Sequence, residues 1–240
     1  MQYGGINNAT MPTGYRVPFQ NKAFRWLLQP LFRGLFHLLS PVTITGRQNV
    51  PRHGAYVIAI NHVSTYDPPL VVAFWPSPPE AVGAVEIWSR PGQSQLARLY
   101  GGIQAHRGEY DRRLLETMIA ALQAGRPLLL APEGGRSHKP GLRRGLPGVA
   151  YVADKAGVPV VPVGVIGTTE DYFQRARRGE RPPVEISIGS PLRLPHVNGH
   201  GVERRTALQN NTDLLMRHLA ALLPPEYRGV YASDGSSEAL

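Results

Sequence analysis

The sequence contains no cysteine, and this absence excludes disulfide bonds, a thiol nucleophile and a thiolate metal site. It also lacks an uninterrupted run of about 18 apolar residues, the length that a membrane-spanning helix requires, so we expect no spanning helix. The first 22 residues are polar and rich in glycine and asparagine, without the apolar core of a signal peptide. From these absences we expect the protein to stay in the cytoplasm.

Acidic residues are scarce: 17 of them stand against 26 lysines and arginines, which gives a net charge of +9. This excess favours an anionic partner, such as nucleic acid, phospholipid head groups or a phosphorylated substrate. Nucleic acid is the weakest of the three, because no recognised nucleic-acid module is present and aromatic residues are not interleaved with the basic runs. With 42% hydrophobic residues, the 240-residue chain can bury a substantial core.

Beyond Pro41, short apolar segments typical of strands alternate with segments typical of helices. Strands are predicted over residues 42–46, 55–60, 81–87, 102–105, 127–131, 158–166 and 184–189. Helices are predicted over residues 67–74, 93–100, 111–125, 145–156 and 202–223. This alternation predicts a single α/β domain, residues 41–228, with a largely parallel central sheet flanked by helices. We expect the ends, 1–22 and 229–240, to be mobile.

Segment 23–40, which precedes this domain, has a very uneven distribution of polar residues. A polar residue recurs at every fourth position and forms one stripe on a helix: Arg25, Gln29, Arg33 and His37. Large apolar side chains cover the remainder, and Pro30 is expected to kink the helix. The pattern suits an amphipathic helix lying in the membrane interface, with its basic residues near anionic head groups. A core helix of the soluble domain would show the same pattern.

Three polar clusters follow predicted strands: residues 61–67, 106–107 and 133–136. Ligands bind at the carboxyl ends of parallel strands, so this position favours a functional role over a structural one for each cluster. We therefore expect the functional site at that edge of the sheet.

The first cluster contains His62 and Asp67, five positions apart. A free imidazole titrates close to neutral pH, which suits a histidine to take a proton from a hydroxyl, and a carboxylate on its other ring nitrogen would fix the tautomer. Asp67 also has a purely structural interpretation, either as an N-cap before Pro68 or as the partner of Ser64 in a capping box. Because the sequence has neither cysteine nor a Gly-x-Ser-x-Gly elbow, the base would activate a substrate hydroxyl directly.

The third cluster, 133–136, combines a glutamate, two glycines and Arg136. Glycines let backbone N–H groups approach an anion closely, and an arginine can bind a phosphate with two parallel hydrogen bonds. An ordinary glycine turn with solvated charges would look the same. Arg107 is either a second anion ligand or a surface arginine, and the pair 143–144 is more typical of a solvated face.

The order of these motifs resembles the glycerolipid acyltransferases, especially the 1-acyl-sn-glycerol-3-phosphate acyltransferases. Their first motif, Asn-His-x-Ser-x-x-Asp, is matched by Asn61, His62, Ser64 and Asp67. The second is matched by Gly102, Ile103 and Arg107, and the fourth by Pro159, Pro162 and Val163. The third, Pro-Glu-Gly-(Thr or Gly)-Arg-Ser, is matched by Pro132, Glu133, Gly134, Gly135, Arg136 and Ser137. The resemblance covers roughly residues 43–193.

The resemblance implies direct acyl transfer. His62, oriented by Asp67, would deprotonate the free hydroxyl of a lysophosphatidate-like acceptor as it attacks an acyl thioester, giving phosphatidate for phospholipid biosynthesis. Arg107 and Arg136 would hold the acceptor phosphate, and Glu133 would organise its loop. The remaining motif residues would complete the substrate site: Asn61, Ser64, Gly134, Gly135 and Ser137.

The acyl donor would be acyl-CoA or acyl carrier protein, with no metal or other cofactor, and the enzyme would be peripheral on the cytoplasmic face of the cell membrane. Gln104 and His106 replace the phenylalanine and aspartate that are usual in the second motif. The acceptor therefore stays open between lysophosphatidate and glycerol 3-phosphate, a lysophospholipid or an amino-acid lipid. A non-catalytic protein that binds anionic lipid is the alternative from another class.

Overall fold

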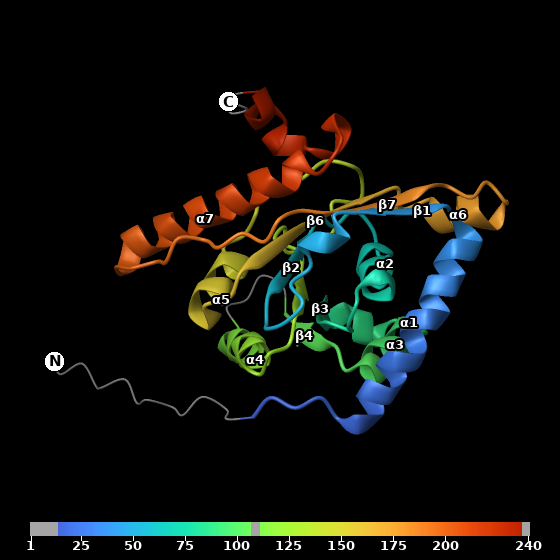
Figure 1. Cartoon of the computed structure of the whole chain (residues 1–240), viewed down its shortest axis with the longest axis horizontal. Helices are drawn as coiled ribbons and strands as arrows, with labels where there is room; N and C mark the ends of the chain where they lie inside the picture. The colour runs from blue at the N-terminus through green and yellow to red at the C-terminus, as the bar shows by residue number, and fades with distance from the viewer. Residues whose placement is uncertain (1–13, 107–110, 237–240) are drawn as a thin grey trace.

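Seven strands form one sheet in the order β1-β7-β6-β2-β5-β3-β4. A computed structural model describes the chain over residues 14–106 and 111–236 (Figure 1). The strands are β1 Val42–Thr45, β2 Val57–Ile60, β3 Glu80–Ala84, β4 Ile103–Ala105, β5 Leu128–Leu130, β6 Val160–Ile166 and β7 Val184–Ile188. The helices are α1 Phe19–Leu39, α2 Asp67–Phe74, α3 Gln93–Tyr100, α4 Arg112–Gln123, α5 Gly148–Ala156, α6 Tyr172–Arg177 and α7 Gly201–Ala221.

The sheet is mostly parallel, which confirms the predicted α/β class. β2 lies in the middle, between β5 and β6, and pairs parallel with both. β7 pairs antiparallel with β6 and parallel with β1, so β1 and β7 run antiparallel to the other five strands. All four residues of β2 are buried, as expected for a strand covered on both faces.

Helices cover both faces of the sheet (Figure 1). One core joins α1, α2 and α3 to the side chains of β2 and β6 that point toward them, including Ile58 and Val161. The opposite core joins α4, α5 and α7 to the alternate side chains of the same strands, including Val57 and Val160. This period of two along β2 and β6 explains why both strands are apolar throughout.

Local signals predict most element boundaries. α2 and α3 occupy the predicted 67–74 and 93–100, and Asp111 caps α4 by accepting a hydrogen bond of 3.0 Å from the Leu114 N–H. The predicted strand 81–87 is wrong in its second half, because β3 ends at Ala84 and a 3-10 turn, Val85–Ser89, follows. This turn brings Ile87 and Trp88 back over Gly83, where a Cβ would lie only 3.1 Å from Ile87.

Packed residues extend into both terminal segments that were expected to be mobile, 1–22 and 229–240. α1 begins at Phe19, and the buried Asn21 amide donates to two carbonyls at the end of α3. At the other end Tyr231 is buried against α7. Packed residues are therefore present on both sides of the predicted boundaries at 22 and 229, whereas residues 1–13 and 237–240 lie outside the described residues.

The polar stripe of α1 faces the protein, which corrects the expectation that it faces lipid head groups. Arg25 is buried, and Gln29 donates to the carbonyls of Val72 and Trp75. Arg33 donates two hydrogen bonds to the Ala73 carbonyl. Carbonyls in the last turn of a helix lack partners within that helix, so this stripe satisfies the C-terminal end of α2. The helix continues through Pro30 to Leu39.

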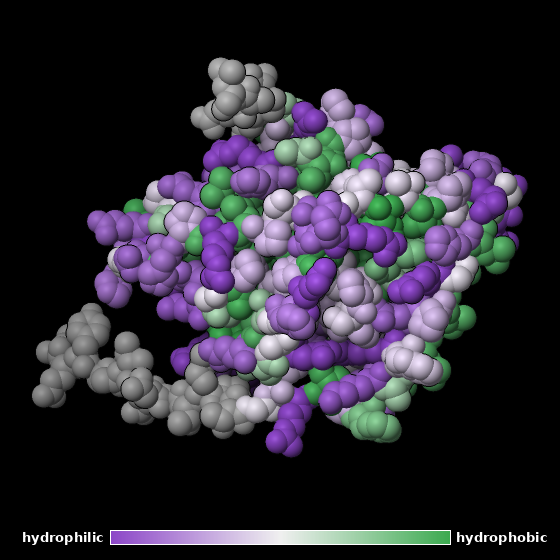
Figure 2. Space-filling model, in the orientation of Figure 1, coloured by the Kyte–Doolittle hydropathy of each residue, from purple (hydrophilic) through white to green (hydrophobic). Residues whose placement is uncertain are grey.

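Apolar side chains of α1 are exposed instead. The most exposed are Phe19, Trp26, Leu27, Leu31, Leu35 and Leu38. Figure 2 shows hydrophobic side chains along the edge of the molecule where Figure 1 places α1. Within the described part of the chain, no helix combines the length and the apolar character that crossing a membrane requires.

A buried ion pair attaches α1 to the first residue of β3. Arg25 donates to both oxygens of Glu80, at 2.8 and 2.7 Å, and the two side chains are 2% and 0% exposed. Tyr15 and Arg126 also donate to this carboxylate, at 2.8 and 3.0 Å. Burial by itself raises the pKa of Glu80, but the hydrogen bonds and charge of Arg25, followed by Tyr15 and Arg126, hold the pKa below its ordinary value.

Replacing Glu80 by Gln should reduce the free energy of unfolding by roughly 3–5 kcal/mol, because Arg25 would remain buried without its anion. Since the folded-state pKa of Glu80 is depressed, its contribution is present above the ordinary glutamate pKa and is lost as pH falls through the folded-state value. The gap between wild type and Glu80→Gln in denaturant titrations should therefore narrow in acid. Glu116→Gln, which breaks the exposed Arg112–Glu116 pair, should change stability little. If the difference in unfolding free energy between wild type and Glu80→Gln did not depend on pH, the ion-pair assignment would be contradicted.

Candidate active site

The segments that follow β2, β5 and β6 lie side by side at the carboxyl ends of these central strands. These strands are parallel neighbours, with Ala59 beside Leu130 and Ile60 beside Val163. Their carboxyl ends therefore bring together residues 61–67, 132–137 and 167–170. The first and third polar clusters lie next to each other, as predicted.

His62 and Asp67 form a pair at these strand ends. Asp67 Oδ2 lies 2.9 Å from His62 Nδ1 and accepts a hydrogen bond of 2.8 Å from the Ser64 N–H. Asp67 Oδ1 accepts a short hydrogen bond from the Thr168 hydroxyl, which comes from the segment after β6. The Asp67 side chain is fully buried, whereas that of His62 is 14% exposed. A buried carboxylate with three donors is well satisfied, so its position is fixed.

Asp67 has a structural role at the start of α2 as well as a contact with His62. Tyr66 is the N-cap of α2, and Asp67 is its first residue, followed by proline. Neither predicted cap is therefore present, and the Asp67 carboxylate instead closes the turn before α2 by accepting from the Ser64 N–H, while Ser64 Oγ accepts from the Tyr66 N–H at 3.2 Å. An acidic residue here is also favoured by the helix dipole. One carboxylate thus closes the turn and orients His62.

The Asp67 contact determines the tautomer of His62. An ionised carboxylate only accepts hydrogen bonds, so Nδ1 must carry the proton and Nε2 is left with its lone pair. Among the described residues, none is hydrogen-bonded to Nε2. His62 therefore has the arrangement of a general base.

The backbone of His62 is held on both sides by the segment 132–137. Glu133 Oε1 accepts from the His62 N–H at 3.0 Å, and the Ser137 N–H donates to the His62 carbonyl at 2.8 Å. Glu133 Oε2 also accepts from the Arg143 N–H at 2.9 Å. Burial raises the pKa of the Glu133 carboxyl, partly offset by the N–H groups of Arg143 and His62. Glu133 thus positions the loop that carries His62.

Two predicted substrate-binding residues are buried and act in positioning. The Asn61 amide donates to the Val165 carbonyl at 2.8 Å and accepts from the Val165 N–H at 2.7 Å, so both its ends are occupied by β6. Ser64 is also buried, and its hydroxyl is used within the turn. With these partners the two side chains position the loop after β2, and their contact with substrate stays a prediction.

The glycines of the third motif have a structural reason. Gly134 has a φ of +68°, and a Cβ there would lie 2.5 Å from Leu146 Cδ1. Its N–H donates to the Ala131 carbonyl at 3.0 Å and so is not free for an oxyanion. The Gly135 carbonyl accepts from the Arg143 guanidinium, and Arg143 and Arg144 are both exposed, as expected for a solvated face.

The predicted anion ligands are placed differently from one another. Arg136 lies beside the site, with Nη1 3.7 Å from Glu170 Oε1. Arg107 lies outside the described residues. His106 follows the edge strand β4, where its side chain is 53% exposed and lies 3.7 Å from Asp111. The second motif is thus separated from β2 by two strands, and the proposed roles of Arg136 and Arg107 stay predictions.

Sequence reasoning missed Thr168, Glu170 and His138, which border the catalytic pair. The signal for the first two was available, since 167–170 directly follows the predicted strand 158–166 and strand ends carry the other clusters. A threonine and a glutamate in a polar loop have no distinctive spacing, however. Their role appears only once β6 is placed beside β2.

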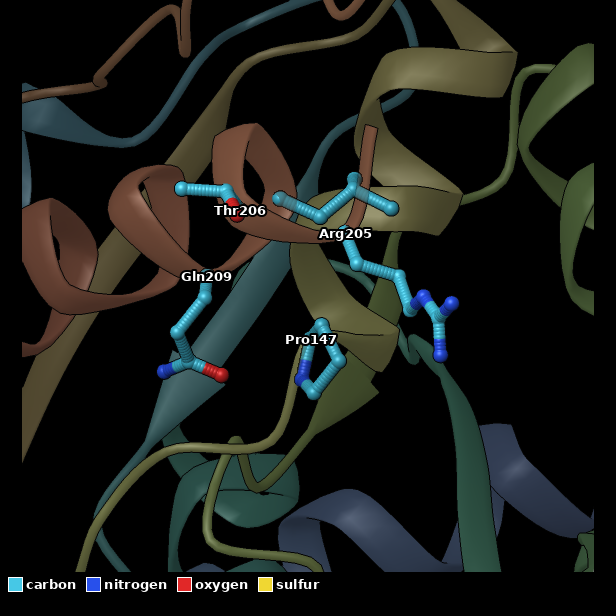
Figure 3. A pocket seen from close by; sticks show the side chains of 5 residues that line it. Pro147, Arg205, Thr206 and Gln209 are labelled. Carbon is cyan, nitrogen blue, oxygen red and sulfur yellow. The ribbon is translucent and has the colours of Figure 1, made fainter. Parts of the chain in front are cut away.

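A separate pocket lies between α5 and α7 (Figure 3). It is lined by Pro147, Arg205, Thr206, Leu208 and Gln209. This lining contains none of the motif residues and no carboxylate or histidine, so we assign it no catalytic role.

The fold and this site define an acyl-transfer enzyme, and the chain belongs to the acyltransferase family. The family model described as Acyltransferase matches residues 41–166, which include the His62–Asp67 pair and Glu133. A curated relative, the lyso-ornithine lipid O-acyltransferase of Pseudomonas aeruginosa, is 30% identical over 199 residues, or 76% of this chain and 74% of that protein.

The fold resembles that of a solved acyltransferase. The crystal structure of the 1-acyl-sn-glycerophosphate (LPA) acyltransferase PlsC from Thermotoga maritima superposes with a TM-score of 0.59 at 23% identity. The similarity covers 81% of this chain and 79% of that one. At this identity the comparison supports the α/β architecture alone.

Replacing His62 by Ala should reduce acyl transfer by a factor on the order of 10² to 10⁴, the usual contribution of a general base. Asp67→Asn should cost up to about 10⁴ in rate by favouring the wrong tautomer. The matched control is His196→Ala, because His196 Nδ1 also contacts a carboxylate, Asp154, at 2.7 Å but lies outside the site. Initial rates of thioester consumption, with circular dichroism to verify folding, measure the effects. Equal rates for His62→Ala and His196→Ala would contradict the assignment.

Proposed function

We propose that the protein is an O-acyltransferase that moves a fatty acyl group from a thioester to the free hydroxyl of a lysolipid. The observation that carries this proposal is His62, whose Nδ1 is held by the buried Asp67 while Nε2 has no hydrogen-bond partner in the part of the chain that the structure describes. Nε2 takes the hydroxyl proton as the oxygen attacks the thioester carbonyl. The C–O bond forms, the C–S bond breaks, and the imidazolium returns its proton to the thiolate.

The hydroxyl groups near His62 support direct transfer without an acyl-enzyme. Ser64 Oγ is buried and bonded to the Tyr66 N–H, Thr168 donates to Asp67, and Ser137 Oγ donates to the Lys139 carbonyl at 2.7 Å. None of these oxygens is bonded to His62, so none is arranged as its nucleophile. The hydroxyl that reacts is then the substrate's own.

The first candidate acceptor is lysophosphatidate, converted to phosphatidate in phospholipid biosynthesis, with Arg136 and Arg107 as phosphate ligands. A second candidate is a lyso-amino-acid lipid, favoured by the 30% identity to a lyso-ornithine lipid O-acyltransferase. The departures at Gln104 and His106 agree with an acceptor other than lysophosphatidate. The acyl donor in either case is acyl-CoA or acyl carrier protein, and we propose no further cofactor.

Thiol release from acyl-CoA and from acyl carrier protein, measured across a panel of acceptors, tests the reaction. The panel contains lysophosphatidate, glycerol 3-phosphate, a lysophospholipid and a lyso-ornithine lipid. We expect at least one lysolipid to accelerate thiol release well above hydrolysis, with the acylated lipid found by mass spectrometry. A panel in which every acceptor leaves the hydrolysis rate unchanged would contradict the proposed reaction.

We also propose that α1 attaches the enzyme to the membrane as a peripheral protein of the cytoplasmic face. Leu27, Leu31, Leu35 and Leu38 are spaced by four, four and three residues and form one exposed apolar strip. Lys22, near the start of the helix, is also exposed, whereas the Arg33 guanidinium is bonded to the Ala73 carbonyl. Apolar burial and attraction to anionic head groups, about 1 kcal/mol per basic residue near the surface, would then act together. Arg25 is excluded from this attraction because it is buried.

The double substitution Leu31→Gln and Leu38→Gln should weaken binding to anionic vesicles about 30-fold, if each leucine contributes about 1 kcal/mol through partial burial. The control Val202→Gln and Val230→Gln removes two apolar side chains of similar exposure, 72% and 65% against 66% and 73%. Co-sedimentation with vesicles, at low and high salt, measures binding. High salt should weaken wild-type binding only in part, because the apolar contribution is not screened. Equal loss in both double variants would show that α1 is not the membrane surface.

A further inference from the structure

A charged cluster borders the catalytic pair and includes the residue predicted to bind phosphate. Glu170 Oε1 lies 3.7 Å from Arg136 Nη1 and 2.5 Å from His138 Nδ1. The side chain of Arg136 is 22% exposed, that of His138 is 58% exposed and that of Glu170 is 49% exposed. Arg136 is therefore already beside a carboxylate that solvent can reach.

The backbone attaches this cluster firmly to the site. The Ser137 N–H donates to the His62 carbonyl, and the His138 N–H donates to the Val63 carbonyl at 3.1 Å. His138 has a φ of +66°, which is uncommon for a residue other than glycine. Thr168, two residues before Glu170, donates to Asp67. Glu170 therefore lies in a loop whose neighbour Thr168 contacts Asp67, and its carboxylate contacts His138, whose backbone is bonded to the segment that carries His62.

This arrangement is unfavourable for a phosphate monoester. A phosphate that binds Arg136 must approach Glu170, and the two negative charges repel each other over a few ångströms. A head group with one carboxylate and one ammonium meets no such conflict, because its carboxylate can bind Arg136 and its ammonium can bind Glu170. Ornithine with one amine in an amide bond carries this pair of charges.

On the basis of the proposed lysolipid acylation, we propose that Glu170 is a specificity-determining residue that binds the cationic group of a zwitterionic, amino-acid-type acceptor. The Arg136–Glu170 contact opens, so that Arg136 binds the carboxylate of the head group and Glu170, beside His138, binds its ammonium. Acceptors that carry only a phosphate leave Glu170 without a new partner and are disfavoured. The residue acts on acceptor choice and not on the proton transfer at His62.

The test is a cycle of two proteins and two acceptors. Wild type and Glu170→Gln are each assayed with lyso-ornithine lipid and with the same lipid acetylated on its free amine, which removes the cation. Acetylation should reduce kcat/KM about tenfold for wild type, or 1.4 kcal/mol, and about twofold at most for Glu170→Gln. With lysophosphatidate, Glu170→Gln should equal or exceed wild type. Glu203→Gln, in the first turn of α7, serves as the control and should behave as wild type.

A purely structural role of Glu170 would lower the rates with all acceptors together and leave the effect of acetylation unchanged, which would overturn the inference. Wild type that acylates lysophosphatidate but not lyso-ornithine lipid would also overturn it, while leaving the proposed reaction intact. If no lysolipid accelerates thiol release, the proposed function fails, and this inference fails with it. Thermal unfolding of Glu170→Gln verifies that the variant folds.

Discussion

The active site depends on one buried carboxylate. Asp67 is removed from water, so its charge must be matched by hydrogen-bond donors, and it finds them in the Ser64 N–H, the Thr168 hydroxyl and His62 Nδ1. These donors come from the segments after β2 and β6, which meet only because the two strands are parallel neighbours. The requirement to satisfy this charge therefore positions the imidazole, to which we assign the proposed proton transfer.

The same principle of matched buried charge recurs in the rest of the structure. Glu133 accepts from the backbone of His62 and of Arg143, and so fixes the loop after β5 against the loop after β2. Glu80 accepts from Arg25 and joins α1 to the sheet. Because its polar stripe faces the protein, α1 exposes Leu27, Leu31, Leu35 and Leu38, and these form an apolar surface on an enzyme whose proposed substrate is a lipid.

The fold class and the contact between His62 and Asp67 can be predicted from the sequence because both depend on local patterns. Apolar runs identify β2 and β6, and His62 and Asp67 share a single turn at a strand end. The roles of Asn61 and Glu133 depend on which strands are neighbours, and no periodicity shows that. The stripe that contains Gln29 is ambiguous for a related reason, since polar residues at every fourth position look the same whether they face water or the carbonyls of another helix.

The central claim is that Asp67 holds His62 as the tautomer with its proton on Nδ1. Nitrogen chemical shifts of the His62 ring, measured by long-range proton–nitrogen correlation at a pH where the ring is neutral, test this claim most directly. The account predicts a protonated Nδ1 and an unprotonated Nε2 in the wild-type protein, with this preference lost in Asp67→Asn. A proton on Nε2 of the wild-type ring would contradict the account, because that nitrogen could not then accept the proton of an acceptor hydroxyl.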